Sequence, residues 1–320
     1  MGRPSLRDTA RMPRILDDRH VRPAVATLLG CSDVGSGPTD EQLALIDALA
    51  TTYFGLDDGL AGIDPVDPST AAASFSTAAE RRRMRELLVA VELCRHPLEA
   101  DQVARTDAYI QALGADDAST DIVRDLVRDG VAAAAADFLR SFGEHEPELR
   151  EPSLAGARGS APLTTDPDLA ARLGRLHACP AGSLGRAYVE FYDRYGFAIP
   201  GSDDQPAAVF VAHDMCHVIA DYEPDGVGEI ALGAMQLALT DSDVHWIQFL
   251  GNLGVHEAGY LTMGAANASL GRPGAAETVA HAMDRGARCT DDFTLVDHLA
   301  MVDEPLDDVR RRYGVPPRER

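Results

Sequence analysis

The chain has 320 residues, of which 45% are hydrophobic and 25% are charged, and its formal net charge at pH 7 is −22. This balance is that of a globular protein with room for one large or two medium domains. The strong negative charge argues against a nucleic-acid-binding role, because phosphate recognition needs a basic surface.

The first 150 residues show four segments in which apolar residues recur at helical spacing. These segments cover residues 43–54, 84–94, 98–114 and 123–142. Thr77 and Glu80 have the spacing of a capping box before the second segment, and Pro97 follows its end. No run shows the sustained alternation of a half-buried strand. Residues 1–150 are therefore predicted to form an N-terminal helical bundle.

A stretch rich in proline, glycine and serine follows and predicts a linker over residues 151–167. Helical patterns then resume. Asp166 and Pro167 are suited to the start of a helix, and the stretch "SLGRAYVEFYDRYG" has an apolar stripe that ends at Gly196. The sequence thus predicts an all-α protein of two helical domains, the second covering residues 168–320.

The stretch "HDMCHVIADYEPDGVGE", residues 213 to 229, concentrates polar side chains that bind metals. A helix is expected from Pro206 to about Asp221. On it, His213 and His217 lie about 40° apart and Asp214 lies about 60° from His217, so the three share one face. Apolar neighbours follow the same face, which predicts that it is turned inward.

Glu229 opens the next predicted helix, after a glycine-containing turn that brings two antiparallel helices together. The pattern HDxxH-x11-E therefore offers His213, Asp214, His217 and Glu229 as ligands of one divalent metal: zinc, iron or manganese. One carboxylate, Asp214 or Glu229, would instead act as a general base or orient a histidine. The alternative is a metal-free helix pair in which the two carboxylates hydrogen-bond the histidines.

Residues 168 to 317 resemble the coenzyme Q biosynthesis protein 4 family. The resemblance rests on "HDMCHV", its spacing to "GEIALGAMQL", the upstream "PAGSLGRAYVEFYDRYGF" and the C-terminal "EPLDDVRRRYGVPP". The family's proposed metal ligands fall on His213, Asp214, His217 and Glu229. Two features depart from it: the chain between Phe197 and His213 is shorter, and Cys216 stands where the family often has an aromatic residue. The N-terminal bundle is an extension that shorter members lack.

The resemblance implies a role in quinone or related aromatic metabolism. The expected activity is oxidative decarboxylation and hydroxylation of a prenylated or otherwise hydrophobic aromatic acid, with Asp214, Glu229 and Arg186 as catalytic residues. Arg186 would pair with the substrate carboxylate, unless it only forms a salt bridge or caps a helix end. Two alternatives remain open. The first is a non-catalytic, lipid-binding scaffold of a quinone-biosynthesis complex. The second is a metal-dependent hydrolase or tailoring enzyme of a natural-product pathway, against which the absence of lysine counts.

Five widely spaced cysteines without a C-x-x-C pair argue against a disulfide framework and indicate a reducing compartment. The N-terminal residues lack the apolar core of a signal peptide, and no stretch has the roughly 20 apolar residues of a membrane span. A cytoplasmic protein is expected, with peripheral membrane contact as an option. The expected assembly is a homo-oligomer or a biosynthetic complex.

Overall fold

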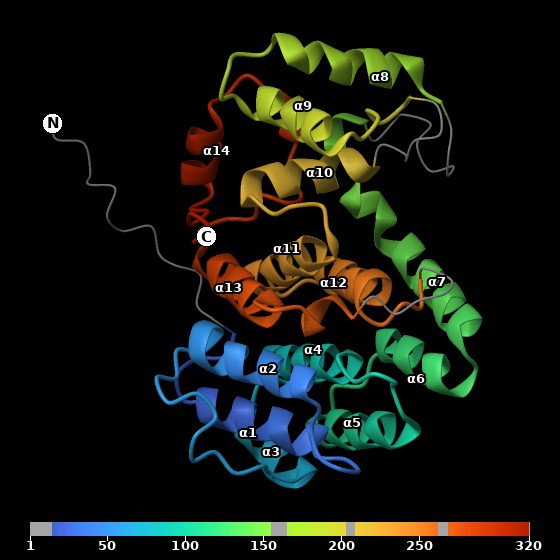
Figure 1. The fold of residues 1–320 in the computed structure, drawn as a ribbon, viewed down its shortest axis with the longest axis vertical. Coiled ribbons are helices and arrows are strands. Elements are labelled where there is room, and N and C mark those ends of the chain that lie inside the picture. The colour runs from blue at the N-terminus through green and yellow to red at the C-terminus, as the bar shows by residue number, and fades with distance from the viewer. Residues whose placement is uncertain (1–14, 155–164, 203–208, 262–267, 320) are drawn as a thin grey trace, which may run out of the picture. The chain divides into compact units, whose positions relative to one another are not determined.

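The computed structural model describes residues 15–154, 165–202, 209–261 and 268–319. All regular structure in these ranges is helical, and no strand forms among these residues (Figure 1). The predicted all-α fold is therefore confirmed. In the described part of the chain, no helix combines the length and the apolar character needed to cross a membrane.

The chain groups by its internal contacts into two units, neither of which is continuous in sequence. Unit 1 contains Glu144–Glu223 and Arg288–Arg320, and unit 2 contains Pro13–Gly143 and Pro224–Ala287. This grouping cuts across the predicted division at residues 151–167, because residues 224–287 pack with the N-terminal helices. That residues 1–150 and 168–320 fold as independent domains stays a prediction.

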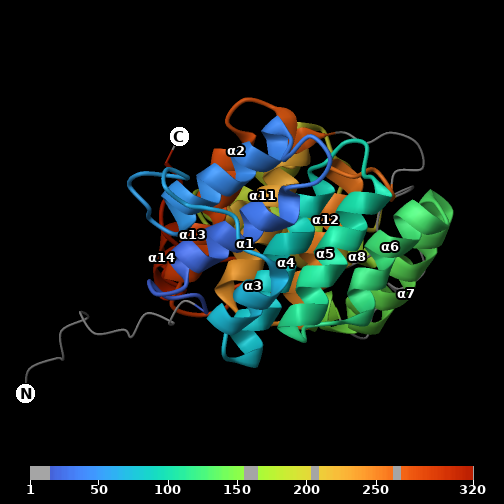
Figure 2. The same cartoon turned by 90° about the horizontal axis from the view of Figure 1, so that it is seen from below.

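Unit 2 is a bundle of helices whose buried residues are mostly apolar. Its helices are α1 (Val21–Ser32), α2 (Asp40–Ala48), α3 (Pro68–Ser74), α4 (Ala78–Leu93), α5 (Ala100–Leu113), α6 (Asp121–Arg128), α11 (Gly226–Leu239), α12 (Asp243–His256) and α13 (Ala275–Arg288). Helix α7 (Val131–Leu149) starts in unit 2 and ends in unit 1. In Figure 2, α1, α4 and α5 lie side by side, in agreement with their mutual contacts.

Small residues allow the closest helix contacts of unit 2. A Cβ atom on Gly286 of α13 would lie 2.1 Å from the carbonyl oxygen of Met235 in α11. A Cβ atom on Gly233 would lie 2.9 Å from the Asn252 side chain of α12. Helices α11, α12 and α13 therefore pack at distances that only glycine permits at these positions.

Helix α4 carries charged side chains into the interior of unit 2. Arg83, Arg85 and Glu86 are all at least 96% buried. The Arg83 guanidinium donates a hydrogen bond to the Leu237 carbonyl and lies 3.2 Å from a carboxylate oxygen of Glu86. Burial raises the pKa of Glu86 to about 7, although the two arginines act in the opposite direction. Desolvation is therefore the larger effect at this carboxyl group.

Unit 1 contains the final turn of α7 and the helices α8 (Pro167–Gly174), α9 (Leu184–Tyr195), α10 (Val209–Ala220) and α14 (Leu306–Arg312). Helix α9 packs against both α10 and α14 (Figure 1). The N-terminal half of α9 is held by backbone hydrogen bonds from Leu184 and Gly185 to the carbonyls of Glu304 and Val302. The motif helix α10 therefore has α9 on one side and the C-terminal segment on another.

Several predicted helix ends are confirmed. Thr77 and Glu80 form the capping box of α4, Asp166 caps α8, and α9 ends at Gly196 in a left-handed conformation. The predicted start at Pro206 lies outside the described residues, and so do residues 155–164 of the predicted linker. Glu151, at the beginning of that linker, is fully buried. Its burial is a consequence of contacts with residues far along the chain.

The raised pKa of Glu86 predicts a pH-dependent contribution to stability. Because the folded state binds this proton more tightly, the contribution is complete below the unfolded pKa of 4.5 and is lost as pH rises to about 7. Between these pH values we expect the free energy of unfolding of the wild type to fall relative to that of Glu86→Gln, by up to about 3 kcal/mol. Urea denaturation at pH 5, 6 and 7 measures it, with the exposed Glu277→Gln as the control. A difference that stays constant over this range would contradict the assignment.

Candidate functional site

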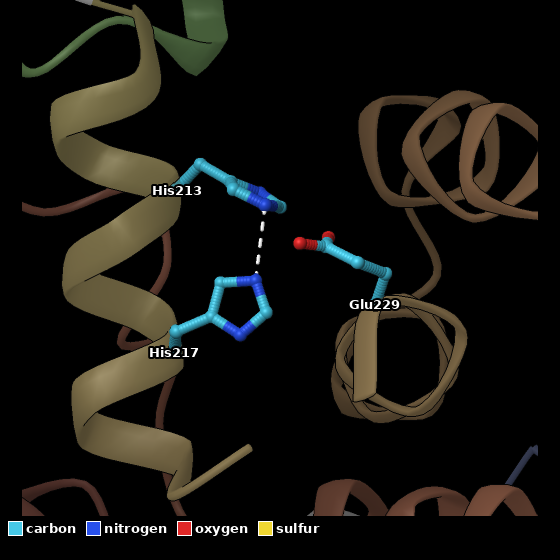
Figure 3. A group of neighbouring side chains, drawn as sticks. All are labelled: His213, His217 and Glu229. Atoms are coloured by element: carbon cyan, nitrogen blue, oxygen red, sulfur yellow. Dashed lines mark hydrogen bonds between the residues drawn. The ribbon is translucent and has the colours of Figure 1, made fainter. Parts of the chain in front are cut away.

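The two histidines of the motif lie on the same side of α10, one turn apart (Figure 3). Their Nε2 atoms are 3.1 Å apart, and their ring planes are nearly perpendicular. His217 is 1% exposed and stacks on Phe191 of α9, whose ring centroid is 5.8 Å away. The sequence predicted from the spacing of four residues that the two histidines share one side of the helix; His217 is buried there and His213 is half-buried.

The orientation of the His217 ring is set by the turn that follows α10. Its Nδ1 atom lies 3.1 Å from the carbonyl oxygen of Tyr222. A carbonyl oxygen can only accept a hydrogen bond, so Nδ1 carries the proton and donates it. In the neutral ring, Nε2 then has a lone pair directed toward His213. This is the tautomer in which a histidine binds a metal through Nε2 while its other nitrogen is held by a backbone carbonyl.

Asp214, the third predicted ligand, accepts a hydrogen bond from the hydroxyl of Tyr192 in α9. Burial raises the pKa of Tyr192 far above its ordinary value, and the neighbouring Tyr188 and the Asp214 charge act in the same direction. Tyr192 therefore stays protonated at neutral pH and donates to the carboxylate. One oxygen of Asp214 is thus held toward α9. Its predicted role as a ligand or a base stays a prediction.

Glu229 lies in the first turn of α11, which Asp225 caps through its side chain. The backbone carbonyl of Glu229 accepts a hydrogen bond from the Asn252 amide. Glu229 belongs to unit 2, whereas His213, Asp214 and His217 belong to unit 1. Its membership of the ligand set therefore stays a prediction from the sequence.

Arg186 makes the contacts expected from the salt-bridge alternative. Its guanidinium donates to Glu190, one helical turn away, and to the carbonyl of His177 at the end of the preceding segment. Its role toward a substrate carboxylate stays a prediction.

A different arginine of the same helix, Arg194, is exposed and makes no hydrogen bond or ion pair with any residue that the structure describes. Sequence reasoning missed it, although it lies eight residues after Arg186.

A cavity of about 130 Å³ lies within unit 1 beside His217. Its wall includes Phe191, His217 and Tyr222, together with Leu306 and Arg310 of α14. Arg194 also lines it. The size is close to that of an apolar cavity of about 150 Å³ that accommodates a benzene molecule. The cavity has the volume of one six-membered ring, and its wall also contains the carboxylates of Glu190, Asp221 and Glu223.

Cys216, the position that departs from the resembled family, is buried in α10. Its sulfur is 4.0 Å from Nε2 of His298 and 4.0 Å from the Thr294 carbonyl. His298 is fully buried, with one nitrogen bonded to the Phe293 carbonyl and the other to Glu151. Cys216 therefore packs against a buried polar pair.

Comparisons with known proteins place the chain in no family. No family model matches the sequence, and no curated protein matches it. Among solved structures, the chain is similar to a "putative ubiquinone biosynthesis protein" from Nostoc punctiforme, with 16% sequence identity and a TM-score of 0.33. The match covers 73% of this chain and 99% of the other. At this level of similarity, the match carries no argument about fold or function, and the family resemblance stays a prediction.

The hydrogen bond between Tyr192 and Asp214 predicts a specific loss of stability. Tyr192→Phe removes the hydroxyl group, so the half-buried carboxylate of Asp214 loses this hydrogen-bond donor. We expect a loss of about 1–3 kcal/mol in the free energy of unfolding. Urea denaturation at pH 7 measures it. Tyr195→Phe on the same helix is the control, because the Tyr195 hydroxyl makes no hydrogen bond with a described residue, and an equal loss in both variants would refute the assignment.

Proposed function

We propose that this chain is a divalent-metal protein in which His213 and His217 are ligands. The observation that supports this most directly is the contact between Nδ1 of His217 and the Tyr222 carbonyl, because it leaves the Nε2 lone pair of a buried imidazole directed at a second imidazole. A buried imidazole lone pair that faces a second imidazole needs a proton or a cation as its partner.

The separation of the two nitrogens fits a shared ion. Bonds of about 2.0–2.1 Å from one metal to two nitrogens place those nitrogens about 2.9–3.4 Å apart, for angles between octahedral and tetrahedral. The observed 3.1 Å lies within this range. The alternative, a single hydrogen bond from His213 to His217 without metal, has the same separation and is the competing hypothesis.

Two carboxylates complete the proposed set. Glu229 is separated from His217 by 11 residues, and the connection from the end of α10 to the start of α11 spans at most about 20 Å. Asp214 is adjacent in sequence to His213 and is oriented by Tyr192. A set of two imidazoles with one or two carboxylates suits zinc, iron or manganese. In this proposal Glu229 is the third ligand, and Asp214 is a ligand or the base beside it.

The proposed substrate is a hydrophobic aromatic acid, as the family resemblance implied, and the proposed reaction is its oxidative decarboxylation and hydroxylation. The support for this substrate class is the ring-sized volume beside His217, with Arg194 as a cation for the substrate carboxylate in a wall that also holds three carboxylates. A metal held by the histidines would supply activation of dioxygen or polarisation of the carboxylated carbon. The chain itself would hold the ring against Phe191.

Metal analysis tests the proposed ligands. Purified wild type is expected to contain about one equivalent of a transition metal, and His217→Ala and Glu229→Ala are expected to lose most of it, because each variant removes one of few ligands. Elemental analysis of the three proteins gives the metal-to-protein ratio. His281→Ala and Glu277→Ala are matched controls, since both residues are exposed on α13. Negligible metal in all five proteins after incubation with zinc, iron(II) or manganese would refute the site.

Turnover distinguishes the enzyme from its alternatives. The metal-loaded protein is incubated with a prenylated hydroxybenzoic acid, dioxygen and a two-electron donor, and carbon dioxide and the hydroxylated ring are measured. The enzyme hypothesis predicts both products with wild type and neither with His217→Ala. Tight retention of the acid without turnover would favour the scaffold, and metal-dependent cleavage of a simple phosphoester would favour the hydrolase.

A further inference from the structure

The turn after α10 places a non-glycine residue, an aspartate, in the left-handed region of backbone conformation. Asp221 ends the helix with a φ of +61°, in the left-handed region that residues with a Cβ atom rarely adopt. This conformation directs the chain backward, so that the Tyr222 amide donates to the His217 carbonyl and the Tyr222 carbonyl meets the His217 ring. The hydrogen bond that selects the His217 tautomer therefore depends on this one residue's conformation.

A conformation of this kind persists only where surrounding contacts hold it. Arg318 provides three such contacts. It donates a hydrogen bond of 2.7 Å to the Asp221 carbonyl, pairs with the Glu223 carboxylate, and places its guanidinium over the Tyr222 ring, 4.8 Å from the centroid. One side chain thus contacts each of the three residues that make the turn.

Arg310 holds the preceding turn of the same helix. Its Nε and Nη2 atoms donate to the carbonyls of Ile219 and Val218, each at 2.9 Å. These carbonyls belong to the last turn of α10, where backbone acceptors lack helical partners and a cation is favoured. Arg310 and Arg318 both come from the C-terminal segment 306–318, and all of these contacts lie within unit 1.

From these contacts we infer that Arg318 and Arg310 are positioning residues for His217. None of the contacts described above joins Arg318 or Arg310 to the ring of His213 or His217. They fix the turn whose carbonyl holds the Nδ1 proton, and so they keep Nε2 available as a ligand atom. This inference rests on the proposed function only for its effect on metal affinity, because its effect on the ring itself exists without metal.

The test uses metal-free, full-length protein labelled with ¹⁵N-histidine. Long-range ¹H–¹⁵N correlation spectra report which ring nitrogen of His217 carries the proton. Wild type is expected to show a single tautomer, protonated at Nδ1. Arg318→Met, which keeps the length and apolar contact of the side chain but removes its donors, is expected to show a mixture of both tautomers. Its affinity for zinc is expected to fall about 10-fold to 100-fold.

Three further variants make the result decisive. Arg318→Lys keeps the charge and should recover part of the affinity, and Arg310→Met should act in the same direction as Arg318→Met. Arg311→Met is the matched control, because the exposed Arg311 pairs with Asp308 on its own helix. Circular dichroism and thermal unfolding establish that each variant is folded, and Arg318→Gln replaces the methionine variant if that one does not fold.

The outcomes separate this inference from the proposed function. Wild-type tautomer and wild-type zinc affinity in a folded Arg318→Met variant would overturn the inference. A changed tautomer in Arg318→Met, in a protein whose wild type binds no metal, would support the positioning role and refute the metal site. A changed tautomer together with weakened zinc binding would support both.

Discussion

The hydrogen bond from Nδ1 of His217 to the Tyr222 carbonyl is the interaction on which the candidate site depends. It decides which of the two distinct ring nitrogens carries the proton, so that Nδ1 is the donor and Nε2 the acceptor. Phe191 stacks on one face of the ring and fixes its rotation about the side chain. The turn, the stacking partner and the neighbouring histidine together leave His217 one orientation, and that orientation presents Nε2 to His213.

The all-α fold and the histidine pair were predictable because both depend on spacing along a helix. Capping residues such as Thr77 and Asp166 act on their own helix ends, so their effect is also visible in the sequence. The partners of Asp214 and His217 were not predictable in the same way. Tyr192 reaches Asp214 from another helix, and the Tyr222 carbonyl is placed by a residue with a positive φ that is neither glycine nor asparagine.

The contacts that join distant segments of unit 1 could not be predicted from the sequence for a related reason. Composition marked residues 151–167 as a linker, yet Glu151 is fully buried and its carboxylate oxygens contact the His298 ring and the Leu299 amide. These contacts join residues almost 150 positions apart, and no local pattern reports them. The two ring nitrogens of His298 lie 2.9 Å from a Glu151 carboxylate oxygen and 2.9 Å from the Phe293 carbonyl, so this buried pair has polar partners on both sides. Glu151 is buried because it pairs with residues that are distant in the sequence, and composition does not report such pairs.

Arg318 lies 97 residues after the carbonyl that it binds. A short peptide that copied residues 209–229 would contain every predicted ligand and still lack the side chain that fixes the turn. In such a peptide Asp221 would return to the conformations that a non-glycine residue prefers, and the His217 ring would exchange freely between its two tautomers. The motif is therefore not a portable metal-binding element, and transplanting it to another helical scaffold would require a cation placed at the end of its first helix.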